Sequence, residues 1–218
     1  LQSQSVPPAV NPDLETERLN TWLDEQYEKQ LDFSPETRTI LGEKTDNHRI
    51  SDYSIAGLEQ QTDWLRQSVS AMQSEFDYDL LNDDGKVSYD MWAFGLAQAE
   101  RGLPYLNHGY IFGRGSLQTG VVSFLIGFQQ VDTAEDVDSY ISRLREIDRV
   151  FDQLLVRAEQ AALDGIRPPA FSYEFAIEEI QRITSGAPFN SNDNVPNSPI
   201  WVDIQAKINA LLENEVID

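Results

Sequence analysis

The sequence predicts a mostly α-helical protein, a multi-helix array or bundle with one Gly-rich irregular or extended segment at about residues 103–131. Two observations predict this class. Apolar residues recur at steps of three and four along most of the chain, as they do on one face of an α-helix. Ser, Thr and Pro stand where such stretches begin, and Gly or Pro stands where they end.

The first part of the chain predicts three helices. An apolar stripe over residues 15–31 predicts the first of them. Ser34 and Pro35 are typical of an N-cap and a first helical turn, and Gly42 is placed to end a short second helix. The strongest stripe, over residues 55–76, predicts a long helix that packs against at least one other helix.

The middle of the chain changes in character. A polar turn at residues 82–85 precedes a helix that we expect from about Val87 to Arg101. In the segment 103–131, glycine, β-branched and aromatic residues replace the helical period, so we expect extended or irregular chain with residues 121–128 as its buried part. Helical periodicity alone does not decide the conformation of this segment.

The last part of the chain predicts three more helices. Thr133, with an acid at the third helical position, begins a long helix that Gly165 ends. A second apolar stripe covers residues 173–183. A polar connector at 190–197 then precedes a last helix that begins at Ser198.

The domain organisation that we expect is a disordered tether at 1–12 followed by one helical region at 13–218. The tether is rich in Gln, Ser and Pro, although a cloning boundary in an ordinary terminus gives the same composition. Because the first residue is Leu1, we expect a processed or trimmed terminus. The two longest stripes are expected to cover each other. The core residues predicted on them are Leu58, Leu65, Val69, Phe76, Leu144, Phe151 and Leu155.

Composition excludes several classes of function. The 37 acidic and 16 basic residues give a net charge of −21, which repels phosphate backbones, so nucleic acid is not an expected partner. No transmembrane segment is expected, because the longest apolar run, residues 121–128, is far shorter than the ~20 residues of a membrane span. The sequence contains no Cys, and therefore no disulfide, thiolate nucleophile or Cys metal site.

Motifs for metals and nucleotides fail on their spacing. If Gly85 occupied the sixth position of a calcium loop, Leu80 and Met91 would stand where acidic ligands are needed; a turn that caps the next helix is the better interpretation. The glycines at 115 and 120 are spaced as in a phosphate loop, but no Lys and Ser or Thr follow them. We therefore predict no catalytic, cofactor-binding or metal-binding residue in this chain.

The sequence has two histidines, and neither has the spacing of a zinc site. His48 lies in a charged stretch and is interpreted as a surface loop residue. His108 lies between Asn107 and Tyr110, beside glycine, so Asn107, His108 and Tyr110 are candidates for residues that face a cleft. A structural hydrogen-bonding role for His108 is the alternative.

Short motifs spread over nearly the whole chain carry a family resemblance. They are Leu23-Asp-Glu-Gln-Tyr27 with Phe33-Ser-Pro35 and Leu41-Gly-Glu-Lys44; Asp52-Tyr-Ser54; Phe76-Asp-Tyr-Asp79 with Ser88-Tyr-Asp-Met-Trp92; His108-Gly-Tyr110; and Gly165-Ile-Arg-Pro-Pro169. In this order they resemble the bacterial domain-of-unknown-function 885 family, whose members are longer, mostly helical, zinc-peptidase-like proteins that are often exported, some as lipoproteins.

The resemblance implies a role rather than a catalytic residue. The family's presumed metal segment, a His-Glu pair followed by Pro-Gly-His-His, would follow Asp218, so zinc is expected only in that C-terminal half. This chain then resembles a non-catalytic N-terminal helical portion of a metallopeptidase-like hydrolase, which packs beside that half and walls the cleft for a peptide substrate. A location in the cell envelope, periplasmic or lipid-anchored, is implied, with the cytoplasm as the alternative.

A second interpretation comes from the residues themselves. The chain could be a self-contained acidic helical binding or scaffold domain whose surface meets a basic partner. Self-association is a further expectation, because the apolar residues of the last helix need cover on more than one side. A reading frame that continues past Asp218 into a His-Glu motif would favour the first interpretation.

Overall fold

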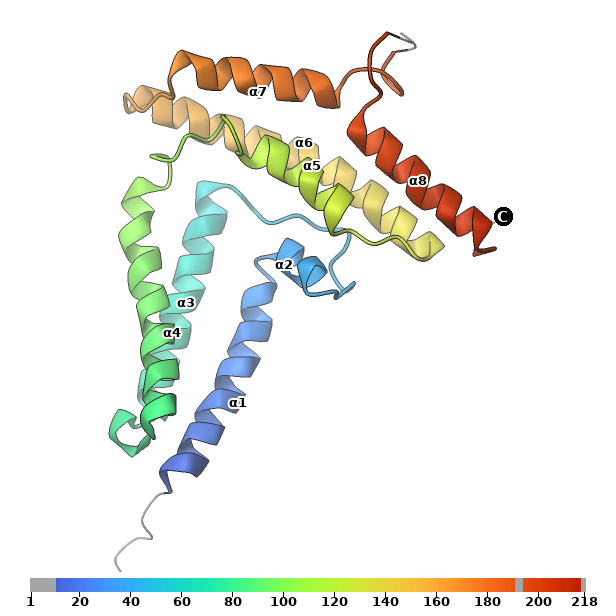
Figure 1. The fold of residues 1–218 in the computed structure, drawn as a ribbon. Helices are drawn as coiled ribbons and strands as arrows, with labels where there is room; N and C mark the ends of the chain where they lie inside the picture. Colours follow the sequence, from blue (N-terminus) through green and yellow to red (C-terminus); the bar gives the residue numbers. More distant parts are fainter. Residues whose placement is uncertain (1–10, 191–193, 217–218) are drawn as a thin grey trace, which may run out of the picture. The chain divides into compact units, whose positions relative to one another are not determined.

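The computed structural model describes residues 11–190 and 194–216, and all regular secondary structure within these ranges is helical (Figure 1). The α-helices are α1 Pro12–Leu31, α2 Pro35–Ile40, α3 Ile55–Glu75, α4 Asp83–Gly102, α5 Leu117–Gly127, α6 Ala134–Leu163, α7 Ala170–Ile183 and α8 Pro199–Glu213. Short 3-10 turns lie at Tyr78–Leu80 and Leu103–Tyr105. The predicted mostly α-helical class is confirmed.

The chain divides into two compact units. Unit 1 contains the described part of residues 1–32 together with residues 56–104, and unit 2 contains residues 33–55 and the described part of 105–218. The predicted tether at 1–12 lies outside the described residues except for Asn11 and Pro12, which are the N-cap and first residue of α1. Of the predicted connector, residue 190 and residues 194–197 are described, and they are not helical.

Unit 1 packs α1, α3 and α4 around one apolar cluster. Leu19 of α1 and Met72 of α3 are completely buried, and Phe76 and Leu81 are nearly so. The partly buried residues that surround them are Trp22, Leu23, Tyr89, Trp92 and Ala93. The guanidinium of Arg18 lies 3.9 Å from the centre of the Phe76 ring, which covers the edge of the cluster.

Helix α4 begins four residues earlier than the sequence predicts. The Asn82 side chain accepts a hydrogen bond from the Gly85 backbone N–H at 2.9 Å, so the polar turn is the N-cap and first turn of α4. The Asn82 backbone N–H in turn donates to Thr16 Oγ1 of α1 at 3.1 Å. A Cβ on Gly85 would lie 2.5 Å from that oxygen, so glycine permits this approach of α4 to α1.

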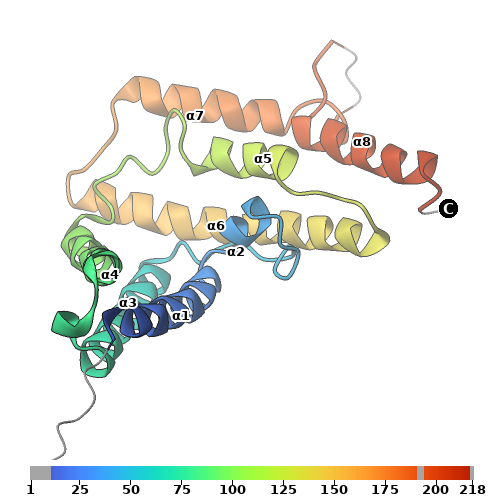
Figure 2. The same cartoon turned by 60° about the horizontal axis from the view of Figure 1, so that its bottom comes forward.

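Unit 2 places α5 between α6 on one side and α7 and α8 on the other (Figure 2). The prediction of extended or irregular chain is therefore wrong for residues 117–127, whereas residues 106–116 form no regular element. Helix α5 buries Val121, Val122 and Leu125 at helical spacing, but the positions that it exposes carry Gly, Ser and Ile and no charged residue, so its sequence shows an apolar run without a polar face. Such a run does not distinguish a buried strand from a buried helix.

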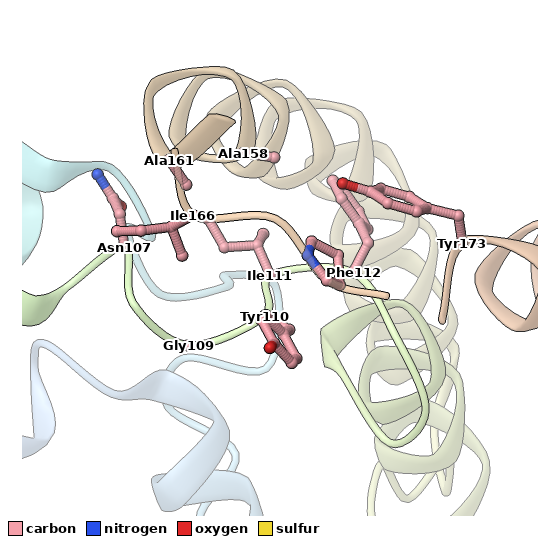
Figure 3. Close-up of a pocket in the computed structure, with 10 residues that line it drawn as sticks. Asn107, Gly109, Tyr110, Ile111, Phe112, Ala158, Ala161, Ile166 and Tyr173 are labelled. Carbon is pink, nitrogen blue, oxygen red and sulfur yellow. The ribbon is translucent and has the colours of Figure 1, made fainter. Parts of the chain in front are cut away.

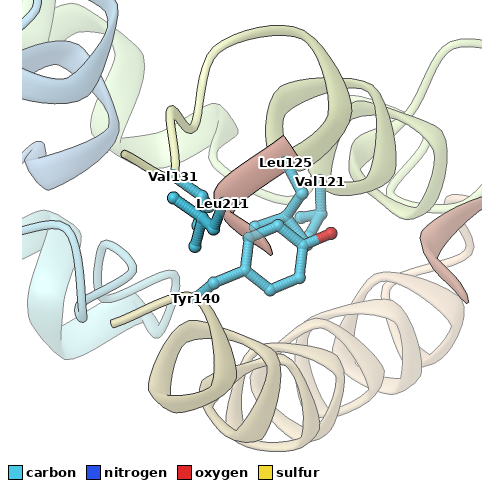
Figure 4. Close-up of a cluster of buried hydrophobic side chains, with 5 residues drawn as sticks. All are labelled: Val121, Leu125, Val131, Tyr140 and Leu211. Atoms are coloured by element: carbon cyan, nitrogen blue, oxygen red, sulfur yellow. The ribbon is translucent and has the colours of Figure 1, made fainter. Parts of the chain in front are cut away.

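The cluster under α5 joins three helices of unit 2. Figure 4 shows Val121 and Leu125 of α5 beside Tyr140 of α6 and Leu211 of α8, with Val131 closing the group. The Tyr140 hydroxyl donates to Asp203 of α8 at 2.9 Å. Burial, together with the Asp203 carboxylate, raises the Tyr140 pKa, so this phenol stays protonated as a donor.

Asp203 also accepts a hydrogen bond from Lys207 at 2.7 Å, and the Lys207 ammonium donates to the Leu125 carbonyl oxygen at 2.8 Å. This polar group is satisfied within unit 2 and fixes α8 against α5. Leu211 is only 3 % exposed, so the last helix folds back onto its own unit.

Buried arginine is a second organising feature of unit 2. Arg143 of α6 is fully buried and donates to the carbonyl oxygens of Asp46 (3.0 Å) and Arg49 (2.8 Å). It also donates to Thr39 Oγ1 (3.1 Å) and Gln129 Oε1 (3.0 Å). Burial lowers the Arg143 pKa to about 10. The four acceptors offset this cost, and Arg143 holds the non-helical segment 46–53 against α6.

The same face of α6 continues the contact toward its C-terminus. Arg149 donates to the Ile50 carbonyl oxygen at 2.9 Å. The Gln153 side chain accepts the Tyr53 backbone N–H at 3.0 Å and donates to the Asp52 carboxylate at 2.8 Å. We call Arg143, Arg149 and Arg157 the arginine face of α6. These arginine side chains donate hydrogen bonds to the backbone carbonyl groups of segment 46–53, as the N–H groups of a neighbouring strand do in a sheet.

The predicted core is correct in part. Leu65, Val69 and Phe76 are buried in unit 1, but Leu155 is 50 % exposed. Leu58, Leu144 and Phe151 are partly buried. The two stripes were expected to cover each other; each is instead buried by helices of its own unit, because α5 supplies the apolar surface that α6 needs.

The start of α6 shows the predicted capping box. Thr133 Oγ1 accepts the Asp136 N–H at 3.2 Å, and Asp136 accepts the Thr133 N–H at 3.1 Å. Asp136 also accepts a hydrogen bond from Lys44 at 2.6 Å. Burial acts to raise the Asp136 pKa, but Lys44 and the backbone donors outweigh it, so the pKa lies below 3.8.

We predict that Asp136→Asn lowers the free energy of unfolding by about 1 kcal/mol at pH 7, because the carboxylate is lost from the capping box and from Lys44. The pKa of Asp136 is lower in the folded than in the unfolded chain. Its contribution is therefore complete above pH 3.8 and disappears as the pH falls through the folded-state pKa. Urea unfolding of both proteins at several pH values from about 7 to about 3 measures the difference in unfolding free energy.

The matched control is Asp138→Asn, an exposed position two residues further along α6. It should change stability by no more than about 0.5 kcal/mol. An equal loss in both variants, or a difference that grows as the pH falls, would contradict the role of Asp136.

Candidate functional site

A small solvent-open pocket lies in unit 2, where the C-terminal part of α6 faces the 107–112 loop and the start of α7 (Figure 3). Its lining residues are Asn107, Gly109, Tyr110, Ile111, Phe112, Ala158, Ala161, Ile166, Pro168 and Tyr173. None of these ten side chains carries a charge. The pocket is therefore apolar, with one amide and two phenol groups as its polar side chains.

The loop side of the pocket is fixed by the last arginine of the arginine face. Arg157 donates to the Asn107 side-chain oxygen at 3.2 Å and to the Leu106 carbonyl oxygen at 2.7 Å. A third hydrogen bond reaches the Tyr53 carbonyl oxygen at 3.1 Å. Burial lowers the Arg157 pKa. Arg157 thus joins α6, the end of segment 46–53 and the loop that forms the pocket.

The other end of the loop is held by α5. The completely buried Gln118 donates from Nε2 to the Gly113 carbonyl oxygen, and the Ser116 hydroxyl donates to the Tyr110 carbonyl oxygen at 3.3 Å. The Phe112 ring stacks on Phe151 of α6, with ring centroids 6.3 Å apart. These contacts hold the apolar wall of the pocket without help from a ligand.

Two of the three candidate cleft residues line the pocket. Asn107 and Tyr110 do so, whereas His108 packs edge-on against Tyr105, with ring centroids 5.1 Å apart. His48 is exposed in its loop. His108 is exposed, and its contact with Tyr105 is between rings, which is not the hydrogen bond of the structural alternative.

The sequence did not point to the rest of the lining. In the sequence, Ala158 and Ala161 have no feature that distinguishes them from other helix residues, and Ile166 follows the glycine that ends α6. Tyr173 was assigned to an apolar stripe, but it is 43 % exposed and extends toward the pocket with its hydroxyl foremost (Figure 3). The one available signal was the Gly165-to-Pro169 motif, which ends α6 and brings α7 back over the loop.

The described residues do not fit a zinc ion. Among them there is no group of three or more His, Cys, Asp or Glu side chains placed to hold a metal. A tetrahedral protein site needs at least three such ligands. We therefore derive no chemical step through a metal in the part of the chain that the structure covers. In the same ranges, no helix is both long and apolar enough for a membrane span.

We predict that Arg157→Met loosens the 106–113 loop. Three acceptors, two of them backbone carbonyls, lose their donor, so stability should fall by about 1–3 kcal/mol. Amide hydrogen exchange should accelerate first in the loop, because it loses its attachment to α6.

Arg145→Met is the matched control, because Arg145 is an exposed arginine of the same helix. Exchange in the loop should be unaltered in this control. If amide exchange in the loop is as slow in Arg157→Met as in the unaltered protein, the role of Arg157 in holding the loop is contradicted.

A family model matches the greater part of the chain. A sequence model of the family described as "Bacterial protein of unknown function (DUF885)" matches residues 35–218, from the first residue of α2 onward. Curated proteins give no match. The matched range includes the whole pocket, the segment 46–53 and the arginine face of α6. The resemblance inferred from the sequence motifs is confirmed, and the chain belongs to the DUF885 family of bacterial proteins of unknown function.

Proposed function

We propose that this chain is a non-catalytic helical portion of a metallopeptidase-like protein of the bacterial cell envelope. In this proposal the pocket of unit 2 is part of the wall of a peptide-binding cleft. The observation that carries the proposal is the pocket itself, which is open, apolar and held in place by Arg157 and Gln118. Membership of the DUF885 family supports it.

The surface beside the pocket suits a peptide. Tyr105 and Tyr110 are 60 % and 54 % exposed, and Phe171 at the start of α7 is 69 % exposed. Aromatic rings that are fixed at a surface bind peptide chains through ring faces and, for tyrosine, through the hydroxyl. An apolar pocket with exposed aromatic residues nearby is typical of a binding surface and has no need of a nucleophile.

In this proposal, peptide hydrolysis takes place in another part of the protein. The resemblance of the sequence motifs supports the proposal that a zinc ion and its general base lie in a C-terminal half of the protein. A periplasmic or lipid-anchored location is proposed from the family resemblance. The part played by this chain is to hold and orient the substrate.

One observation favours the second candidate, an acidic binding or scaffold domain. Helix α4 of unit 1 exposes an apolar stripe of Val87, Met91 and Phe94, which are 58 %, 69 % and 62 % exposed. Asp84 and Asp90 lie close to this stripe in the sequence of the helix. An apolar stripe with acidic residues beside it suits a basic amphipathic helix, and that binding would weaken as salt is added.

We predict that residues 1–218 alone do not hydrolyse peptides, because the described ranges hold no group of His, Cys, Asp or Glu side chains placed to bind a metal ion that would activate water. The whole gene product, assayed beside it with added zinc, should hydrolyse peptides and lose this activity with a chelator. The measurement is peptide turnover by both proteins at equal concentration.

Turnover by residues 1–218 that resists the chelator would refute the division of labour. A reading frame that contains no His-Glu segment beyond Asp218 would refute it as well, and would leave the acidic binding domain as the better account.

A further inference from the structure

Helix α4 of unit 1 has apolar side chains on two faces. One face packs on the apolar cluster of unit 1 through Tyr89 and Trp92. Val87, Met91 and Phe94 follow one another at spacings of four and three residues, so they share the other face, and all three are more than half exposed. We call these three residues the α4 row. A row of large exposed apolar side chains is typical of a surface that binds a partner.

Acidic residues lie at the N-terminal end of the α4 row. Asp83 and Asp84 in the first turn of α4 are exposed, and neither forms an ion pair within the described residues. Asp90 accepts a hydrogen bond from a neutral group, the Tyr78 hydroxyl, at 2.9 Å. The ammonium of Lys86 lies 5.6 Å from the centre of the Tyr78 ring and forms no ion pair with these carboxylates. The three carboxylates are therefore available to a cationic partner.

The charge of unit 1 restricts what can cover the α4 row. Unit 1 has 16 acidic and 5 basic residues, a net charge of −11, whereas the longer unit 2 has 21 acidic and 11 basic residues. A second copy of unit 1, or an anionic lipid surface, would bring further negative charge to the acidic end of the row, so repulsion opposes both. A partner with basic residues beside its apolar surface is attracted instead. Among these occupants, charge therefore selects a basic protein partner.

The direction of α4 restricts the form of that partner. The row follows the axis of α4, so an amphipathic helix with apolar residues at the same spacings can lie along it. Basic residues stabilise a helix most in its last turn, because the carbonyl groups there carry partial negative charge. Since the acidic residues of α4 lie at its N-terminal end, the last turn of the partner meets them when the two helices are antiparallel. The two helix dipoles also attract each other in this arrangement.

We propose that the α4 row binds an amphipathic helix of another protein, that this helix runs antiparallel to α4, and that basic residues in its last turns pair with Asp83, Asp84 and Asp90. The inference rests on the second candidate function, the acidic binding domain, and deepens it. It adds the direction of the bound helix, the end of that helix that carries the positive charge, and the exclusion of a second copy of the chain. The pocket of unit 2 takes no part in this binding.

The test is an NMR titration of residues 1–218 with synthetic helical peptides of about 14 residues, which form roughly four turns. All peptides carry the same apolar stripe. The first has Lys in its last turns, the second has the same Lys residues in its first turns, and the third has Glu where the first has Lys. The first peptide should shift the signals of Val87, Met91 and Phe94, with a dissociation constant on the order of 100 μM that rises with added salt. The second should bind about threefold more weakly and the third at least about tenfold more weakly.

Variants of the chain identify the surface. Met91→Gln removes the central apolar side chain of the row and should weaken binding of the first peptide about tenfold or more. Ile177→Gln, at an exposed apolar position of α7 in unit 2, is its matched control and should leave binding unaltered. Asp84→Asn should weaken binding about threefold, whereas Asp138→Asn, at an exposed position of α6, should leave it unaltered. Thermal unfolding of each variant confirms that it is folded.

Full binding by a folded Met91→Gln variant would overturn the proposal, as would a dimer in sedimentation equilibrium that Met91→Gln dissociates, because a second copy would then cover the row. Equal binding of the first and second peptides would overturn the antiparallel arrangement and leave the acidic binding domain standing. Equal binding of the Lys and Glu peptides, or the lack of any shift, would overturn both. None of these results decides whether the chain walls a peptide cleft, which is tested by peptide turnover of the whole gene product.

Discussion

Unit 2 depends on one constraint: the carbonyl groups of the segment 46–53 need hydrogen-bond donors, although this segment lies in no helix or sheet. The arginine face of α6 supplies them. Arg143 is the costliest member, because its charge is fully buried and its pKa falls to about 10. Four acceptors offset that cost, so the pairing of this segment with α6 takes the place of a β-ladder.

The same constraint shapes the candidate site. Arg157 donates to Tyr53 at the end of the segment and also to Leu106 and Asn107 at the start of the pocket loop. One side chain of a 30-residue helix therefore positions the loop that carries Tyr110. A binding loop attached to a rigid helix keeps its shape in the absence of ligand, which reduces the entropy lost on binding.

Much of the fold was predictable because its signals are local. The stripes of α1, α3 and α6 and the capping box at Thr133 depend only on neighbouring residues. Helix α5 was not predictable, because its exposed positions carry Gly, Ser and Ile instead of charged residues, so its sequence shows no polar face. The arginine face was not predicted, because a charged side chain is expected to be exposed unless its distant hydrogen-bond acceptors are known.

The candidate site was predictable only where polar residues cluster in sequence. Asn107 and Tyr110 stand together beside glycine and both line the pocket. The pocket lining also includes Ala158 and Ile166, more than fifty residues further along the chain, and apolar residues at such a separation carry no sequence signal of a common site. His108 was drawn from the same cluster, and its ring turns to Tyr105 instead.

The central claim is that the arginine face of α6 holds unit 2 together, and urea unfolding of Arg143→Met beside Arg145→Met tests it most directly. The buried variant leaves the carbonyl groups of Asp46 and Arg49 without donors and should lose about 2–4 kcal/mol of unfolding free energy. The exposed variant should lose no more than about 0.5 kcal/mol. Equal stability of the two variants would contradict the account.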